Sequence, residues 1–141
     1  LVRELPEKLS GWFPISHEAK DRWVMGVGTG GYGALMAAQN APDAFAGAAA
    51  VNPVLDVACL YGTDYEPKPE YLFGEKEALV SQGYALSPSF QIPVRLYCDA
   101  NHEEKAKQWA QNGAQITVEA VDAENLLEEA FQKYVEGGIQ V

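Results

Sequence analysis

Two hydrophobic patterns alternate along this chain. In the first, apolar residues follow one another almost without interruption over a short run, which is typical of strands buried on both faces of a parallel sheet. In the second, apolar residues recur every three or four positions, which is typical of one face of a helix. The uninterrupted runs predict four strands, at residues 22–27, 45–51, 94–98 and 116–121.

The helical pattern predicts four helices, and each is followed by a proline or a glycine that can end it. Proline follows the first two, Gly113 follows the third, and the pair Gly137-Gly138 is expected to end the last. The predicted helices cover residues 1–13, 31–40, 103–112 and 126–135.

Between the second and third strands, residues 55–91 lose both patterns and are rich in proline, glycine and tyrosine. A long excursion in a small domain is often a lid or a functional loop. Only one short helix is predicted in it, around residues 75–83. Its aromatic side chains predict either a satellite core under the loop or the lining of an apolar pocket. They are Tyr61, Tyr65, Tyr71, Phe73, Tyr84 and Phe90.

After the opening helix, the elements run strand, helix, strand, excursion, strand, helix, strand and helix. Such alternation implies right-handed crossovers and a sheet covered by helices. We therefore expect an α/β fold, a three-layer α/β/α arrangement with a mainly parallel sheet of about four strands. No repeat or interdomain linker is evident, so residues 1–141 are expected to form a single domain.

Composition narrows the possible partners. The formal charge of −10 over 141 residues argues against nucleic acid and anionic membranes, because both bind basic surfaces. No apolar run approaches the roughly 20 residues of a membrane span, and no signal-peptide pattern opens the chain, so a cytoplasmic protein is expected. The two cysteines, Cys59 and Cys98, are far apart and are expected to be buried thiols. Neither a metal nor a cofactor is expected.

The stretch WVMGVGTGGYGAL, residues 23–35, carries a predicted strand through a series of glycines into a predicted helix. It satisfies G-x-G-x-x-G, which cradles the phosphates of a dinucleotide. It also has the spacing of the G-x-S-x-G nucleophile elbow, with Gly28 where the serine would stand. The dinucleotide interpretation is the weaker one, because no acidic residue stands at the end of the next strand. A purely structural role, close packing of strand and helix, is compatible with the elbow.

The run MGVGTGGYGALMAAQNAPDAFAGAAAVNPVLD, residues 25–56, resembles the elbow segment of the esterase D and tributyrin-esterase group of α/β-hydrolases. The resemblance is carried by Gly-Gly-aromatic-Gly-Ala-Leu at 30–35 and by Pro-Asp-x-Phe at 42–45. It is strong over about residues 1–56 and only architectural beyond them. The resemblance implies the C-terminal half of a hydrolase fold, since about four of its eight strands are found here.

The resemblance also implies roles for particular residues. Gly28 occupies the vacant nucleophile position, the N–H of Thr29 matches a donor of the oxyanion hole, and Asp99 matches the catalytic acid. The family's histidine would stand just before the last helix, but residues 122–125 contain none. The family's second oxyanion donor, from an N-terminal loop, has no counterpart in the chain. The remaining elbow positions are Gly26, Gly30, Gly31 and Tyr32.

The chain contains only two histidines. His102 stands directly before the predicted helix 103–112 and is expected to be a surface residue at that helix start. It follows the third strand, whereas the family's base follows the fourth. His17 is expected to lie in a solvated loop.

These features together predict a catalytically silent, esterase-like domain, in other words a pseudoenzyme. One alternative is an active ester hydrolase completed by another chain or segment. Another is a module that binds a small apolar ligand or a protein in the elbow cleft. The apolar strand at 22–27 is expected at an open sheet edge, which predicts a homodimer or a complex with a separate N-terminal fragment. The opening helix is the expected cover for that edge within the chain.

Overall fold

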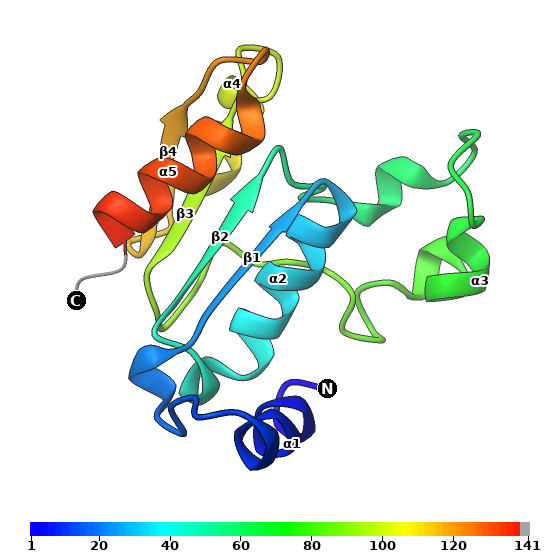
Figure 1. Ribbon diagram of the computed structural model, residues 1–141. Helices are drawn as coiled ribbons and strands as arrows, with labels where there is room; N and C mark the ends of the chain where they lie inside the picture. The colour runs from blue at the N-terminus through cyan, green and yellow to red at the C-terminus, as the bar shows by residue number, and fades with distance from the viewer. Residues whose placement is uncertain (139–141) are drawn as a thin grey trace.

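The computed structural model describes residues 1–138 and contains one four-stranded parallel sheet (Figure 1). The strands are β1 (Trp23–Val27), β2 (Gly47–Val51), β3 (Val94–Cys98) and β4 (Ile116–Ala120). They lie side by side in the order β1-β2-β3-β4, and each pairs in parallel with the next. The expected α/β class and the parallel four-stranded sheet are therefore confirmed.

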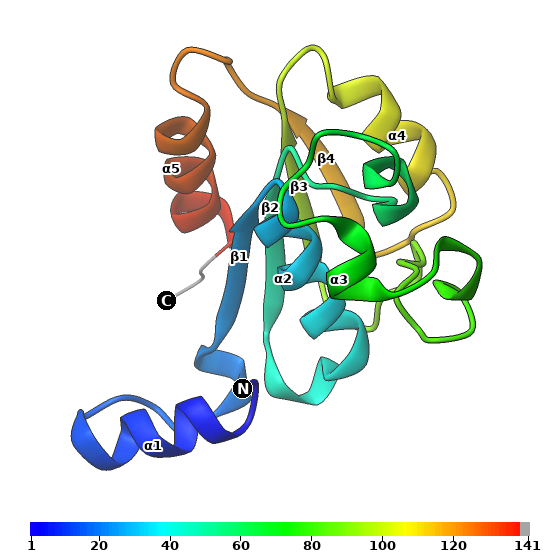
Figure 2. The same cartoon turned by 90° about the vertical axis from the view of Figure 1, so that its right-hand side faces the viewer.

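Helices cover both faces of this sheet and complete three layers, as Figure 2 shows with the sheet nearly edge-on. On one face, α2 (Thr29–Asn40) and α4 (Glu103–Ala110) bury residues such as Leu35 and Ala106 in the larger apolar core. On the other face, α5 (Leu126–Gly138) packs Ala130 and Tyr134 against the sheet. The two shorter helices are α1 (Glu4–Trp12) and α3 (Pro69–Phe73).

The composition of β2 explains how helices can pack so closely on both sides. All five residues of this strand are buried, because β2 lies between β1 and β3 and beneath a helix layer on each face. Successive side chains point to opposite faces, so Ala48 and Ala50 join one core while Ala49 and Val51 join the other. Three adjacent alanines keep the strand thin and let α2 approach the sheet.

The long excursion at 55–91 folds over the side of α2. Three of the six aromatics, Tyr61, Phe73 and Tyr84, form the expected satellite core with Tyr32 of α2, whereas Tyr71 is exposed. The Tyr32 hydroxyl donates to the Tyr84 carbonyl oxygen at 2.6 Å and fixes the loop to the helix. The cluster is completed by Val57, Leu79, Met36, Val54, Ala58, Leu60 and Leu86.

Two expectations about this region are wrong. The α-helix of the excursion is α3, which begins at Pro69, while residues 75–83 contain only a short 3₁₀ turn at Lys76–Ala78. Proline starts helices well, because its fixed φ suits the first turn and its missing N–H is not needed there. Phe90 belongs to the main core rather than to the satellite cluster. The pair Gly137-Gly138 lies at the end of α5, as expected, and Arg95 donates to the Gly137 carbonyl oxygen.

The outer edge of β1 has no strand partner within residues 1–138. The opening helix α1 does not close this edge, because no residue of α1 is buried and the helix stands away from the sheet in Figure 2. Only its beginning reaches the body of the domain, where Leu5 lines an apolar groove with Val24 and Met25 of β1. Trp12 is 74% exposed, so the expected intramolecular cover is incomplete.

We predict that β1 and the apolar side of α1 form the interface of a homodimer. Trp12→Glu should shift the protein toward monomer in sedimentation at micromolar concentration, because a buried carboxylate without a partner is costly. Val80→Glu is the control, since Val80 is also apolar, is similarly exposed at 78% and lies in the excursion, away from α1 and β1. A wild-type protein that sediments as a monomer would contradict the prediction.

Candidate active site

The chain turns from β1 into α2 through Gly28, which has φ 56° and ψ −117°. The positive φ confirms the sharp strand-to-helix turn expected of an elbow and is unfavourable for residues with a side chain. The Gly28 N–H donates to the Val51 carbonyl oxygen at 2.9 Å. The Gly28 carbonyl oxygen accepts from the N–H groups of Tyr32 and Val54, at 3.2 and 3.0 Å. The turn is therefore held to α2, to β2 and to the start of the excursion.

The elbow glycines have different physical roles. A Cβ on Gly26 would lie 2.0 Å from the Gly30 carbonyl oxygen, so the end of β1 touches the backbone of α2 directly. A Cβ on Gly31 would lie 3.1 Å from that of Pro53 and 3.2 Å from that of Ala50. In contrast, added Cβ atoms on Gly28 and Gly30 would meet nothing within 4 Å. Glycine is thus favoured at position 28 by the backbone conformation, and at position 26 by the lack of space for a side chain.

Thr29 is the first residue of α2. The N–H groups of a helix's first turn have no acceptor within the helix, so the Thr29 N–H is available to an oxygen placed outside the elbow. This is the property that the resemblance assigns to Thr29.

Asp99 directly follows β3 and is only 8% exposed. Its Oδ2 accepts from Nδ2 of Asn52 at 2.9 Å, and its own N–H donates to Oδ1 of Asn52 at 3.0 Å. Its Oδ1 accepts from the N–H of Asn101 and lies 2.7 Å from Nδ1 of His102. The hydrogen bond from His102, followed by that from Asn52, holds the pKa of the Asp99 carboxyl below its ordinary value.

The sequence analysis predicts neither Asn52 nor His102 as a hydrogen-bond partner of Asp99. His102 precedes α4 and is half exposed, as expected, but its ring is also paired with the carboxylate three residues earlier. The sequence does contain a signal for the pairing of Asp99 with His102. It is the D-x-x-H spacing at a strand end, which resembles an N-cap arrangement. Asn52 directly follows β2 and has a φ of 41°, a left-handed conformation that asparagine tolerates better than most residues.

Gly28, Asn52 and Asp99 follow three neighbouring strands, so the structure brings them to the same edge of the sheet. The turn after the fourth strand carries no imidazole. There, a Glu129 side-chain oxygen accepts from the N–H of Asp122 at 2.8 Å, and this bond lowers the Glu129 pKa. Carboxylates thus stabilise the turn at 122–125, where the resemblance places a histidine.

The structure corrects the expectation for one cysteine. Cys98 is buried, and desolvation raises the pKa of its thiol to about 11. Cys59 is exposed, because it lies on a 3₁₀ turn at Val57–Leu60 outside the main core. Within residues 1–138, no group of three or more His, Cys, Asp or Glu side chains could hold a metal ion. A search of the same residues for a helix of membrane-spanning length and hydropathy finds none.

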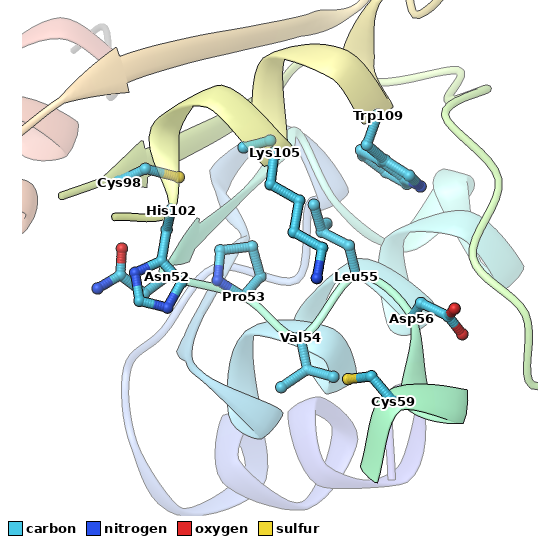
Figure 3. Close-up of a pocket in the computed structure, with 11 residues that line it drawn as sticks. Asn52, Pro53, Val54, Leu55, Asp56, Cys59, Cys98, His102, Lys105 and Trp109 are labelled. Carbon is cyan, nitrogen blue, oxygen red and sulfur yellow. The ribbon is translucent and has the colours of Figure 1, made fainter. Parts of the chain in front are cut away.

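A pocket of about 250 Å³ opens beside the cluster, between the segment that follows β2 and the helix α4 (Figure 3). Asn52 and His102 lie at one end of it and Trp109 at the other. Gly28 and Thr29 do not line this pocket.

We predict opposite effects for alanine at two neighbouring glycines. Gly26→Ala should lower the free energy of unfolding by about 3 kcal/mol, because its methyl group would overlap the backbone of α2. Gly30→Ala should raise it by about 0.5–1 kcal/mol, because alanine favours the helix and meets open space there. Urea denaturation measures both, and equal stabilities would contradict the close approach.

We also predict that Asp99 stabilises the fold in a pH-dependent way. Its pKa is lowered in the folded state, so its contribution is present above the ordinary carboxyl pKa and is lost as the pH falls through the lowered value. Asp99→Asn should therefore lower the denaturation midpoint at pH 7, and the deficit should shrink on acidification. Asp64→Asn, at an exposed position, controls for the loss of one surface charge. A deficit that does not depend on pH would contradict the prediction.

Comparisons with known proteins place this geometry in a family. A family model described as "Putative esterase" matches residues 1–140, and none of the curated proteins matches the chain. Among solved structures, the fluorophosphonate-binding serine hydrolase FphF of Staphylococcus aureus is similar, with a TM-score of 0.71 and 18% identity. The S-formylglutathione hydrolase FrmB of the same organism has a TM-score of 0.71 and 15% identity. The Shigella flexneri enterobactin esterase FES has a TM-score of 0.58 and 15% identity.

The match extends over most of this chain but over only part of those proteins. It covers 94% of this chain for FphF and FrmB and 95% for FES, but 60% of each of the first two proteins and 37% of FES. At identities of 15–18%, the similarity to these solved structures shows a shared fold and no more. The family model, in contrast, matches nearly every residue, and the chain therefore belongs to the "Putative esterase" family.

Proposed function

We propose that this chain is an esterase-family domain that does not hydrolyse esters by the family's serine mechanism. The observation that carries the proposal is Gly28, which has the backbone conformation of an elbow but no side chain to act as a nucleophile. Serine esterases attack the ester carbonyl with an activated hydroxyl, and a backbone position alone cannot form the acyl intermediate.

The position of the base supports the same conclusion. The imidazole that accepts the serine proton must lie within hydrogen-bond reach of it and must be oriented by a third group. The turn at 122–125 has no imidazole to offer. His102 is oriented by Asp99, but it follows β3, two strands away from the elbow in the sheet order.

The bonding of Asp99 is a third supporting observation. In a working triad the acid orients the histidine that serves the nucleophile. Here both Asp99 oxygens already have partners, Asn52 on one and His102 with backbone N–H groups on the other. The carboxylate thus links the ends of β2 and β3 to the start of α4, which is a structural role.

The alternative of an active hydrolase completed by another chain draws on one observation, the unpaired outer edge of β1. That partner would have to supply both a nucleophile and a base, because Gly28 and residues 122–125 supply neither. The proposal of a silent domain requires no such addition and is preferred.

Purified protein should hydrolyse p-nitrophenyl butyrate no faster than buffer, and Gly28→Ser alone should not restore turnover. Loss of a triad serine or histidine lowers kcat by about 10⁶-fold, so adding one member without the other restores little. An active serine esterase assayed in parallel shows that the substrate is competent. Gly28→Ser combined with His102→Asn is the matched control for a displaced base.

Two results would contradict the proposal. One is turnover by the wild-type protein that scales with its concentration. The other is turnover by Gly28→Ser that disappears when His102→Asn is added, because His102 would then be the base.

A further inference from the structure

The pocket beside the Asn52–Asp99–His102 cluster has mostly apolar walls. Pro53, Val54 and Leu55 from the segment after β2 form one side, and Ala106 and Trp109 of α4 form the other. The Trp109 ring packs against Phe90, with the ring centroids 6.5 Å apart in an edge-to-face arrangement. A rigid indole opposite aliphatic side chains is a suitable site for a flat apolar group.

One cationic group lies over these walls. Figure 3 shows the Lys105 side chain extending from α4 across the pocket, with its ammonium group toward Val54 and Leu55. No ion pair of Lys105 is formed within residues 1–138, whereas Lys107 on the same helix pairs with Glu103. Lys105 is thus free to bind an anion that enters the pocket.

The other polar side chains of the pocket leave Lys105 as the group that binds the anion. His102 lines the pocket and directs Nδ1 toward Asp99, so the neutral ring has only an acceptor nitrogen left and does not bind a carboxylate. Asp56 is the acidic residue of the lining, and its Oδ1 accepts from the N–H of Ala58 at 2.9 Å. Figure 3 shows the Asp56 carboxylate turned away from the Lys105 ammonium group.

The geometry points to a binding site for a small carboxylic acid with a flat apolar body, its carboxylate on Lys105 and its body between Leu55 and Trp109. The volume of about 250 Å³ lies below the roughly 300–1,000 Å³ of sites for drug-sized ligands, so the ligand is compact. A single lysine suits a monoanion better than a phosphate, which is usually bound by several N–H donors or by arginine. This site is separate from the elbow, and the inference does not depend on whether the chain hydrolyses esters.

The experiment is a titration of ¹⁵N-labelled protein with benzoate, followed through the indole N–H signals. The chain has three tryptophans, and Trp109 alone among them lines the pocket, so only its signal should shift. Trp109→Phe identifies that signal. Benzamide, which has nearly the same shape without the charge, and benzylamine, which has the opposite charge, should each bind at least about tenfold more weakly.

The matched pair of variants is Lys105→Met and Lys107→Met on the same helix. Lys105→Met keeps an apolar stem and removes the ammonium group, so benzoate affinity should fall about tenfold, the equivalent of losing one charged contact. Lys107→Met should leave the affinity unchanged, because Lys107 does not line the pocket.

The inference is overturned if benzoate does not bind at millimolar concentration, or if benzamide binds as tightly. It is also overturned if the shifted signals belong to Trp12 or Trp23, or if the two lysine variants lose affinity equally. Each of these outcomes is independent of the esterase assay, so failure of this inference and failure of the proposed function can be told apart.

Discussion

The contact on which the rest of the structure depends is the one between the end of β1 and the first turn of α2. Gly26 approaches the Gly30 carbonyl so closely that a single methyl group would not fit. This contact fixes the angle at which α2 leaves the sheet, and it allows the alanines of β2 to meet the helix. Between the two contacting residues, Gly28 turns the chain with a positive φ of 56°, which glycine adopts without strain.

This constraint explains how an elbow can persist without a nucleophile. The hydrogen bonds of Gly28 to Val51, Tyr32 and Val54 tie β1, β2, α2 and the excursion together, and none of them requires a side chain at position 28. Glycine is in fact the residue least strained there, because a side chain at such a φ costs about 1–3 kcal/mol. The turn thus has a folding role that is separable from catalysis.

The same separation holds at the ends of β2 and β3. Asp99 stands where the resemblance places a catalytic acid, yet its hydrogen bonds join Asn52, the start of α4 and His102. The pocket beside these residues is lined by α4, and Gly28 does not line it. We propose that the groups at this edge of the sheet have structural or binding roles.

Local signals predicted most of this architecture. The apolar runs located all four strands, β3 with its correct bounds, and the glycine spacing predicted the elbow at which Gly28 has a positive φ. The features that the sequence did not predict depend on tertiary contacts, which no local pattern contains. The pairing of Asp99 with His102 and Asn52 requires adjacent strand ends, and the failure of α1 to cover β1 depends on how the chain leaves that helix. Proline at position 69 was a local signal for α3, but it was outweighed by the irregular composition around it.

The most direct test of the central claim is intact-protein mass spectrometry of Gly28→Ser after exposure to a fluorophosphonate, which modifies activated serines. The account predicts an unmodified mass, because the elbow would present a hydroxyl with no base to take its proton. A stoichiometric adduct on the introduced serine would contradict it, since the chain would then contain working catalytic machinery around Gly28.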